Sequence, residues 1–430
     1  MKPLQAREVE HACSLILKEV SRTFISVRAV IERVKPPVPR GLLNAVCLGV
    51  LRNYKLAGLA ARHCGLEVDE PFPRSIRGWL KLIAAYEALL RPTLPLERIS
   101  MKTGVDMDIL RCIRESSPEE LVARLPRLRR LSILYSVPLW VIEKLEEVNP
   151  PGGVEALLEA FQRPTPLWLR FNTSRLTREQ ALRMLEKAGI EAEPDSVLPD
   201  LVMVRRAEPG AVERLPRSLF YPQDRAAALP ANLLASRLSG PLAAADLFSA
   251  PGNKAAQLSW RLPGTYVAAV DLSHRRLLDE VRLHSQQGVW LADYASADAR
   301  SPPLRRGSLD AVIVDPDCTS MGRLGHSPET RLFLETTGPG ILRRLVRLQE
   351  ESLSQAITLA RRGGYVVYST CTLTREENED VVRRVAEDTG VEVVDAEPRL
   401  GVEGLIPGVQ RIYPHLHNCT GGFAALLYKP

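Results

Sequence analysis

The stretch LDAVIVDPDC, residues 309–318, decides the fold class of this chain. Its apolar run at 311–314 is uninterrupted, as is typical of a strand that is buried on both faces of a parallel sheet. The run YVVYS at 365–369 repeats this pattern and is also followed by a cysteine, in TCT. Strand and helix patterns alternate on either side of these two runs. The alternation predicts a doubly wound, Rossmann-like α/β domain over residues 223–430.

Two segments precede this predicted domain. Residues 1–148 place apolar side chains at the i, i+3, i+4 spacing of helices and carry almost no strand signal, which predicts an all-α domain. The turn-rich NPPGG that follows marks a boundary. In residues 149–222, two strand-like runs flank a helix that Thr177 and Gln180 begin with a capping box and that Gly189 ends. This pattern predicts a small α+β subdomain.

The composition narrows the class of partner. The chain has 430 residues, a formal net charge of +6 and 57 basic residues, of which 47 are arginine. The guanidinium of arginine can make two hydrogen bonds to a phosphate and can stack on a base, so this bias favours a nucleic-acid partner. The alternative is the arginine-rich surface of a thermophilic protein. No stretch approaches the roughly 18 apolar residues of a membrane span. The first residues lack the apolar core of a signal peptide, and we therefore expect a cytoplasmic protein without a membrane partner.

The seven cysteines are expected to be thiols. None forms a CxxC pair, so the spacing indicates neither a metal cluster nor a disulfide framework. The first four lie in or beside apolar helical faces, where small core residues are expected. The cysteines stand at positions 13, 47, 64, 112, 318, 371 and 419.

Polar residues recur where the predicted strands of the α/β domain end, which is where ligands bind in such sheets. The first strand runs into the turn Ser249–Lys254, and the next three strands end at Asp271, Asp293 and Asp315. The turn is neither a G-x-G-x-x-G nor a Walker A sequence, which argues against a dinucleotide or ATP. Acidic strand ends suit a nucleoside that carries no phosphates, such as S-adenosylmethionine. The alternative is that each aspartate only caps a helix or holds a loop.

Two thiols form the second signal. Cys318 and Cys371 follow neighbouring predicted strands, beside Asp315. One such cysteine alone is usually a buried core residue, and no histidine or cysteine lies at metal-ligand spacing nearby. Two thiols that converge on one crevice beside a carboxylate favour covalent catalysis.

At these residues the chain resembles a known family. The segments DLFSAPGNKAAQL (246–258), DAVIVDPDCTSMGRLGHSPETR (310–331) and GGYVVYSTCTLTREENEDVV (363–382) resemble successive motifs of the RNA cytosine-C5 methyltransferases of the Sun/RsmB type. LRFNTSRLT (169–177) and YPHLHNCTGGFAALL (413–427) support the match, and the helical front part more weakly resembles the NusB-like domain of RsmB-type enzymes. The resemblance implies methylation of carbon 5 of a cytosine in RNA by S-adenosylmethionine. Ribosomal RNA is the favoured substrate, and transfer RNA is the alternative.

The resemblance also implies roles for the catalytic residues. Cys371 is the implied nucleophile, which adds to C6 of cytosine, and Cys318 assists the release of the enzyme. Asp315 is implied to bind the N3 edge of the base, which requires a proton either on the carboxyl group or on N3.

The cofactor and RNA contacts follow in the same way. The turn is implied to hold the methionine and ribose end of the cofactor, Asp271 the ribose hydroxyls and Asp293 the adenine amino group. The implied cofactor contacts are Ser249, Ala250, Pro251, Gly252, Asn253, Lys254, Asp271, Asp293 and Asp315. The implied RNA contacts are Arg170, Asn172, Arg175, Lys254, Pro328 and Arg331.

One departure from the family pattern supports a competing reading. Asp317 stands where the family usually has proline, and a carboxylate beside Cys318 is expected to raise the pKa of that thiol. A catalytically weak RNA-binding or ribosome-assembly factor that keeps the fold is therefore the second hypothesis. Methylation of DNA or of a small molecule is disfavoured. DNA enzymes of this chemistry carry their nucleophile at the position of Cys318, whereas here the better-preserved motif surrounds Cys371. Glu377, Asn378 and Glu379 are expected to cap the helix after Cys371 and to hold its loop, and not to act on the substrate.

Overall fold

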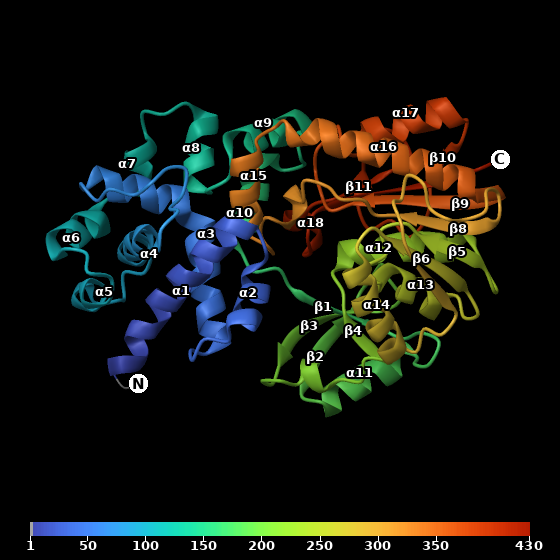
Figure 1. Ribbon diagram of the computed structural model, residues 1–430, viewed down its shortest axis with the longest axis horizontal. Helices are drawn as coiled ribbons and strands as arrows, with labels where there is room; N and C mark the ends of the chain where they lie inside the picture. The colour runs from blue at the N-terminus through green and yellow to red at the C-terminus, as the bar shows by residue number, and fades with distance from the viewer. Residues whose placement is uncertain (1–2) are drawn as a thin grey trace. The chain divides into compact units, whose positions relative to one another are not determined.

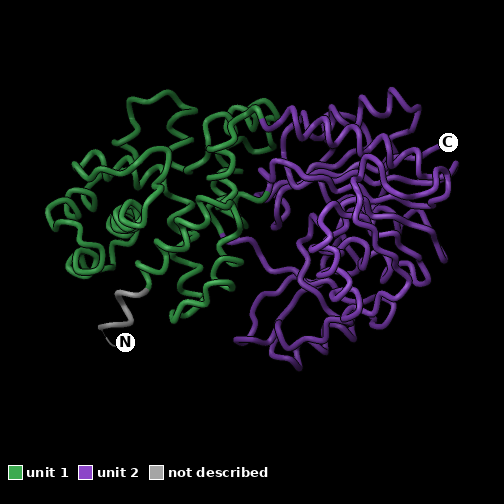
Figure 2. Tube along the Cα trace, in the orientation of Figure 1, with its two compact units in different colours: residues 1–163, 323–340 green, residues 164–322, 341–430 purple. Residues whose placement is uncertain are grey.

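The computed structural model describes residues 3–430, with side chains from residue 9 onward. The chain forms two compact units (Figure 2). The first contains the residues up to 163 together with 323–340, and the second contains 164–322 together with 341–430. The three domain ranges predicted from the sequence stay a prediction.

The described elements of the first unit are helices, as the apolar spacing predicts (Figure 1). Several of these helices begin at a serine or aspartate whose side chain accepts a hydrogen bond from a backbone N–H of the first turn, as at Ser26 and Asp106. Their apolar faces meet in one core, in which Val50 and Trp79 are fully buried. The helices are α1 (Pro3–Thr23), α2 (Val27–Val34), α3 (Arg40–His63), α4 (Ile76–Leu90), α5 (Leu96–Thr103), α6 (Met107–Glu115), α7 (Pro118–Val122), α8 (Arg127–Leu134), α9 (Leu139–Val148), α10 (Gly153–Gln162) and α15 (Thr330–Thr337).

Helix α15 reaches the first unit from far along the sequence. Leu332 lies in the helical core. The indole N–H of Trp140 donates to the carbonyl of Leu334 at 3.1 Å, and the rings of Phe24 and Phe333 meet edge to face at 5.6 Å between centroids. Residues 323–340 therefore belong to the helical unit, although the residues before and after them in the sequence belong to the second unit.

The cysteines of the first unit only partly follow the prediction. Cys13 and Cys47 are fully buried core residues, as expected, with their sulfurs 2.8 Å apart. Cys64 and Cys112 form a disulfide, so the expectation that these two are thiols is wrong. Their separation of 48 residues carries no spacing signal, and only the packing of α3 beside α6 brings their Cα atoms to 5.9 Å.

The second unit begins with the predicted α+β subdomain. Four strands form an antiparallel sheet in the order β2-β3-β1-β4, with helix α11 packed against β2. The predicted capping box at Thr177 and Gln180 begins α11, and Gly189 follows its end with φ +76°. The elements are β1 (Leu167–Phe171), α11 (Arg178–Lys187), β2 (Ile190–Pro194), β3 (Leu201–Ala207), the short 3-10 helix η1 (Val212–Arg214) and β4 (Phe220–Pro222).

A nine-stranded mixed sheet follows, with the order β11-β12-β13-β9-β8-β5-β6-β7 and with β10 beside β13. The strands β7, β6, β5, β8 and β9 run parallel, and β13 adds an antiparallel strand next to β9. The predicted Rossmann-like architecture is confirmed. The strands are β5 (Ala243–Asp246), β6 (Tyr266–Asp271), β7 (Ala292–Ser296), β8 (Leu309–Val314), β9 (Ala360–Thr370), β10 (Glu392–Val394), β11 (Val402–Glu403), β12 (Gln410–Ile412) and β13 (Gly422–Tyr428).

Helices cover both faces of this sheet (Figure 1). On one face, α16 and α17 pack on β8 and β9 through Leu353, Val381 and their neighbours. On the other, α12 and α13 contribute Leu229, Leu233 and Leu258. The helices of this part are α12 (Arg225–Arg237), α13 (Asn253–Arg261), α14 (His274–Gln287), the 3-10 helix η2 (Met321–Arg323), α16 (Ile341–Leu359), α17 (Glu379–Thr389) and α18 (Pro414–His417).

Candidate active site

The candidate site lies at the carboxyl ends of the parallel strands. The chain passes from β5 to β6 on one side, whereas β8 lies on the other side of β5. Such a reversal of strand order leaves a crevice in which ligands of open α/β sheets bind. The turn after β5, Asp271 at the end of β6 and the loops after β8 and β9 all meet at this edge of the sheet.

The turn at residues 249–254 is held by hydrogen bonds from its neighbours. The N–H of Ser249 donates to the carbonyl of Val270 at 3.0 Å, and the N–H of Ala250 donates to Oδ2 of Asp271 at 3.3 Å. Gly252 has φ +94°, a conformation that glycine adopts without strain. The turn and Asp271, predicted as cofactor contacts, are therefore brought together.

Arg170 and Asn172 serve the structure of the protein at this point. Arg170 is fully buried beside Trp260, and its guanidinium donates to the carbonyl of Asn253 at 2.5 Å and to Oε1 of Gln223 at 2.6 Å. Asn172 is only 2% exposed; its amide donates to the carbonyl of Ser218 at 3.0 Å, and its Oδ1 accepts from the N–H of Ser174 at 3.0 Å. Side chains so enclosed do not reach RNA directly, in contrast to the expectation. Arg175 is exposed and stays a predicted RNA contact.

The predicted position of Asp293 at a strand end is wrong. Strand β7 spans Ala292–Ser296, and its register pairs Asp293 with Ala268 and Ser296 with Asp271. Asp293 therefore lies near the amino end of the sheet, where it accepts a 2.5 Å hydrogen bond from the hydroxyl of Tyr266. Asp298, two residues beyond the strand, lies at the carboxyl edge instead. The apolar VWL before Asp293 suggested the strand, but the paired residues begin three positions later.

The two predicted thiols lie together. The sulfurs of Cys318 and Cys371 are 3.0 Å apart, and the hydroxyl of Ser320 lies 3.2 Å from the sulfur of Cys371. The hydrogen bond with Cys371, together with burial, raises the pKa of the Cys318 thiol well above its ordinary value. The raised pKa favours the protonated thiol of Cys318, and either sulfur can donate in the contact between the two cysteines.

A buried glutamate holds the two cysteine loops together. The carboxylate of Glu377 accepts hydrogen bonds from the N–H and hydroxyl of Thr319, at 2.9 and 2.6 Å, and from Thr374 at 2.8 Å. The hydroxyls of Thr319 and Thr372 are 2.6 Å apart. The expected role of Glu377 in holding the loop is confirmed. The expected capping by Glu377 and its two neighbours is wrong, because the side chain of Asn378, the N-cap residue of α17, makes no capping hydrogen bond. Glu377 also contributes to the raised pKa of Cys318, whereas the side chain of Asp317 is exposed to solvent.

Beside the thiols, Lys254 forms an ion pair with Asp315. Ser369 donates to the other oxygen of Asp315 at 3.1 Å, which fixes the plane of this carboxylate. Burial opposes the charge of Lys254, but the attraction of Asp315 outweighs it and raises the pKa of the lysine. Asp246, which sequence reasoning treated only as the end of β5, lies close by. Burial raises the pKa of Asp246 to about 7, against the attraction of Lys254.

The residues at this edge fit S-adenosylmethionine. The amino end of α13 presents backbone N–H groups that suit the carboxylate of a methionine moiety. Oδ1 of Asn253, at the same end, is buried and has no hydrogen-bond partner among the described residues. Asp271 is 4% exposed at the end of β6, where an acid binds ribose hydroxyls.

Pro328 and Arg331, predicted to border the base, both belong to the helical unit. Arg331 is fully buried there and donates to the carbonyl of Phe161 at 3.3 Å. Burial lowers the pKa of Arg331 to about 9. The structure therefore gives Arg331 a packing position in the helical unit and not an exposed surface for RNA.

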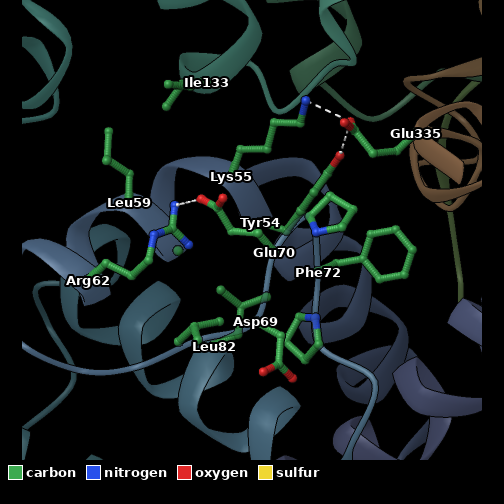
Figure 3. Close-up of a pocket in the computed structure, with 14 residues that line it drawn as sticks. Tyr54, Lys55, Leu59, Arg62, Asp69, Glu70, Phe72, Leu82, Ile133 and Glu335 are labelled. Carbon is green, nitrogen blue, oxygen red and sulfur yellow. Dashed lines mark hydrogen bonds and ion pairs between the residues drawn. The ribbon is translucent and has the colours of Figure 1, made fainter. Parts of the chain in front are cut away.

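The helical unit also contains a cavity of about 410 Å³ (Figure 3). Figure 3 shows that charged groups around it contact one another: Lys55 pairs with Glu335 at 2.6 Å, and Arg62 pairs with Glu70 at 2.5 Å. The hydroxyl of Tyr54 also donates to Glu335 at 3.0 Å. The two contacts of Glu335 tie α15 to α3, and the Arg62–Glu70 pair ties the following loop to α3.

No helix within residues 3–430 is long and apolar enough to cross a membrane. No group of three or more histidine, cysteine, aspartate or glutamate side chains in the described part of the chain is arranged to hold a metal ion.

Comparison with known proteins gives matches over most of the chain. Residues 242–428 match the family described as 16S rRNA methyltransferase RsmB/F, and residues 137–211 match the ferredoxin-like domain of RsmF/B-like methyltransferases. Ribosomal RNA small subunit methyltransferase B of Pectobacterium atrosepticum is 30% identical over 69% of this chain and 67% of its own length. The enzyme of the same name from Serratia proteamaculans is 27% identical over 91% of this chain and 90% of its own length.

A mouse 28S rRNA (cytosine-C(5))-methyltransferase is 28% identical over 71% of this chain, but the match spans only 40% of the mouse protein. Among solved structures, PH0851 superposes over 100% of this chain and 99% of its own, with a TM-score of 0.80 and 21% identity. NSun6 from Pyrococcus horikoshii, solved with SFG, superposes over 68% of this chain and 98% of its own, with a TM-score of 0.58 and 20% identity. These two structures share the fold of this chain.

Proposed function

The chain belongs to the RsmB/F family of 16S rRNA methyltransferases, and from that premise we propose that it methylates carbon 5 of a cytosine in ribosomal RNA through a covalent bond to Cys371. The family uses S-adenosylmethionine, which supplies an electrophilic methyl group when bound. The observation that carries the proposal is the pair of sulfurs 3.0 Å apart, beside the Lys254–Asp315 ion pair and next to the cofactor turn.

The two sulfurs take different parts in this chemistry. Carbon 5 of cytosine is a weak nucleophile, and a thiolate that adds to C6 makes it an enamine carbon that can accept the methyl group. We assign this bond to Cys371, because the raised pKa of the Cys318 thiol disfavours the thiolate form of that residue. After transfer, a water molecule takes the proton from C5, the C5–C6 double bond re-forms, and the C6–S bond breaks with its electron pair returning to the sulfur of Cys371. Cys318 lies at 3.0 Å from the sulfur that must leave and assists this release.

Asp315 and Lys254 hold the target base. One oxygen of Asp315 binds Lys254 and the other accepts from Ser369, while the side chain remains 31% exposed. The exposed lone pairs face the crevice and can accept from a protonated N3 or from the amino group of cytosine. The base must leave any stack to reach this crevice, which favours a loop or a single-stranded stretch of RNA.

The cofactor contacts are the turn 249–254 and Asp271. We assign the adenine contact to Asp298 in place of Asp293, because Asp298 follows the carboxyl end of β7, at the same edge of the sheet as Asp271. The carboxylate of Asp298 is ordered by Arg300 at 2.7 Å, and this hydrogen bond lowers the pKa of Asp298. Asp298 therefore stays an acceptor at neutral pH.

The proposal is tested by methyl transfer from labelled S-adenosylmethionine to separate pools of unmodified ribosomal and transfer RNA. Label recovered as 5-methylcytosine in ribosomal RNA, and absent with Cys371→Ala, is the expected result. Label in transfer RNA alone would move the substrate to the alternative class. If Cys371→Ala still methylates cytosine at C5, the nucleophile is assigned wrongly. Cofactor binding without transfer to either pool would favour the assembly-factor hypothesis.

A further inference from the structure

Helix α14 places two ionisable side chains on its buried face. Glu280 and His284 lie one turn apart, and neither is exposed to solvent. A helix that packs on a sheet normally buries apolar residues at such positions, as α14 does with Leu277 and Leu283. Burying two polar side chains costs free energy unless they are hydrogen-bonded. Their partners therefore show what these residues do.

Both residues face the cofactor turn. The hydroxyl of Ser249 donates to Oε2 of Glu280 at 2.8 Å. Nε2 of His284 lies 2.9 Å from the carbonyl oxygen of Gly252, and Nδ1 lies 2.9 Å from the hydroxyl of Tyr294. The two side chains thus contact the polar groups at the first and fourth residues of the turn.

The hydrogen bonds define the tautomer of His284. A carbonyl oxygen can only accept, so Nε2 must carry a proton and donate it to Gly252. Burial lowers the pKa of His284, and the ring is therefore neutral at pH 7. Nδ1 then accepts from Tyr294, whose hydroxyl sets the direction in which the ring donates. Each hydrogen bond in the series from Tyr294 on β7 through His284 to Gly252 therefore donates toward the turn.

Glu280 is surrounded mainly by acids and neutral groups. Asp246 faces it from β5 and Asp271 from β6, and both raise its pKa; Arg276 of α14 acts in the opposite sense. Burial is the largest cause, and together these effects raise the pKa of Glu280 to about 8, although the hydrogen bond from Ser249 lowers it. Glu280 is therefore a neutral acid at pH 7, and its Oε1 lies 3.6 Å from Nε2 of His284 and forms no hydrogen bond with a described residue.

The pair also sets the space available to the turn. A Cβ atom at Gly252 would lie 2.4 Å from Nε2 of His284 and 2.7 Å from Cγ of Glu280. The backbone of the turn therefore rests directly on these two side chains. A change in either one moves the backbone that the cofactor contacts.

We propose that Glu280 and His284 are positioning residues for the cofactor, holding Ser249 and Gly252 so that the turn presents its backbone to S-adenosylmethionine. This inference rests on the proposed function, in which residues 249–254 bind the cofactor. The pair lies under the turn and not beside Cys371, so it controls cofactor affinity and leaves the chemistry at the base unchanged.

The test compares apolar and conservative variants of the full-length protein. Glu280→Leu and His284→Leu fill the space but remove the hydrogen bonds, whereas Glu280→Gln and His284→Gln keep an acceptor or a donor. Asp279→Asn is the matched control, because Asp279 is 63% exposed on the same helix and forms an ion pair with Arg282. S-adenosylmethionine affinity is measured by calorimetry, and the KM for each substrate and kcat by methyl transfer to RNA.

Each leucine variant should weaken cofactor binding about tenfold, the loss expected from one buried hydrogen bond. The KM for RNA and kcat at saturating cofactor should stay within about twofold of wild type, since the bond-making groups lie elsewhere. The glutamine variants should recover most of the affinity. If both leucine variants lower only the melting temperature and bind the cofactor as wild type does, the residues are structural and the inference is wrong.

The outcomes also separate this inference from the proposed function. Wild-type protein that binds S-adenosylmethionine but transfers no methyl group to RNA would overturn the proposed function, and the calorimetric comparison would still decide the role of the pair. Wild-type protein that binds no cofactor would overturn both. If Glu280→Leu does not fold, the contrast between His284→Leu and His284→Gln decides the inference alone.

Discussion

Replacing Glu280 by glutamine should stabilise the protein increasingly as the pH rises from 5 to 8. The pKa of this buried carboxyl is raised from 4.5 to about 8 in the folded chain. Below pH 4.5 the acid is protonated in both states and contributes no difference. Between pH 4.5 and about 8 the carboxyl of Glu280 ionises only in the unfolded chain, so its contribution to the free energy of unfolding falls as the pH rises. Above about pH 8 this contribution stays constant. Glutamine does not titrate and escapes this loss.

The size of the effect follows from the two pKa values. At pH 7 the unfolded carboxyl is ionised and the folded one is not, over a span of 2.5 pH units from 4.5. At 1.36 kcal/mol for each pH unit, the loss is about 3 kcal/mol at pH 7 and roughly 1 kcal/mol at pH 5. The advantage of Glu280→Gln in the free energy of unfolding should therefore grow by about 2 kcal/mol between pH 5 and pH 7.

Urea unfolding of the full-length protein at several pH values measures this directly. The relevant transition is the one that added S-adenosylmethionine shifts, because it reports on the unit that holds the cofactor turn. Asp279→Asn controls for the loss of one acid at the surface of the same helix. If the stability curves of wild type and Glu280→Gln run parallel from pH 5 to pH 8, Glu280 is ionised in the folded chain and the reasoning from burial is refuted.

Three further predictions concern the site and its surroundings. Cys371→Ala should abolish covalent trapping of RNA that contains 5-fluorocytosine, whereas Cys318→Ala should accumulate a covalent protein–RNA adduct with normal RNA. Both adducts are measured on denaturing gels, and equal trapping by the two variants would contradict the assignment. Asp298→Asn should raise the KM for S-adenosylmethionine about tenfold through the loss of a charged acceptor, and Asp293→Asn should leave it within twofold; the reverse order would restore Asp293 as the adenine contact. Arg331→Met should leave RNA affinity within about twofold in a filter-binding assay and should not lower the melting temperature, because an apolar chain of similar length replaces a buried charge at little cost; a large loss of RNA affinity would place Arg331 at the RNA.

Several elements could be predicted because their signals are local. The apolar runs of β8 and β9 are typical of strands that are buried on both faces, and Asp315 and the two cysteines follow these runs in the sequence. Their position at one edge of the sheet could therefore be predicted. The capping box at Thr177 is likewise a contact between near neighbours. Asp293 was misplaced because an apolar VWL precedes it, although the residues that pair with β6 begin three positions later.

The sequence by itself determined the class of fold, the two thiols and the turn after β5, because periodicity and short motifs are carried by residues close together in the chain. Only the tertiary structure decided the rest. Arg170 and Arg331 are buried, Cys64 meets Cys112, and residues 323–340 join the helical unit, all through contacts between distant segments. Glu280 and His284 gain their neutral forms and their partners only when α14 packs under the turn. Burial and the desolvation that shifts a pKa arise only in the folded chain, and the spacing of residues in the sequence does not predict them.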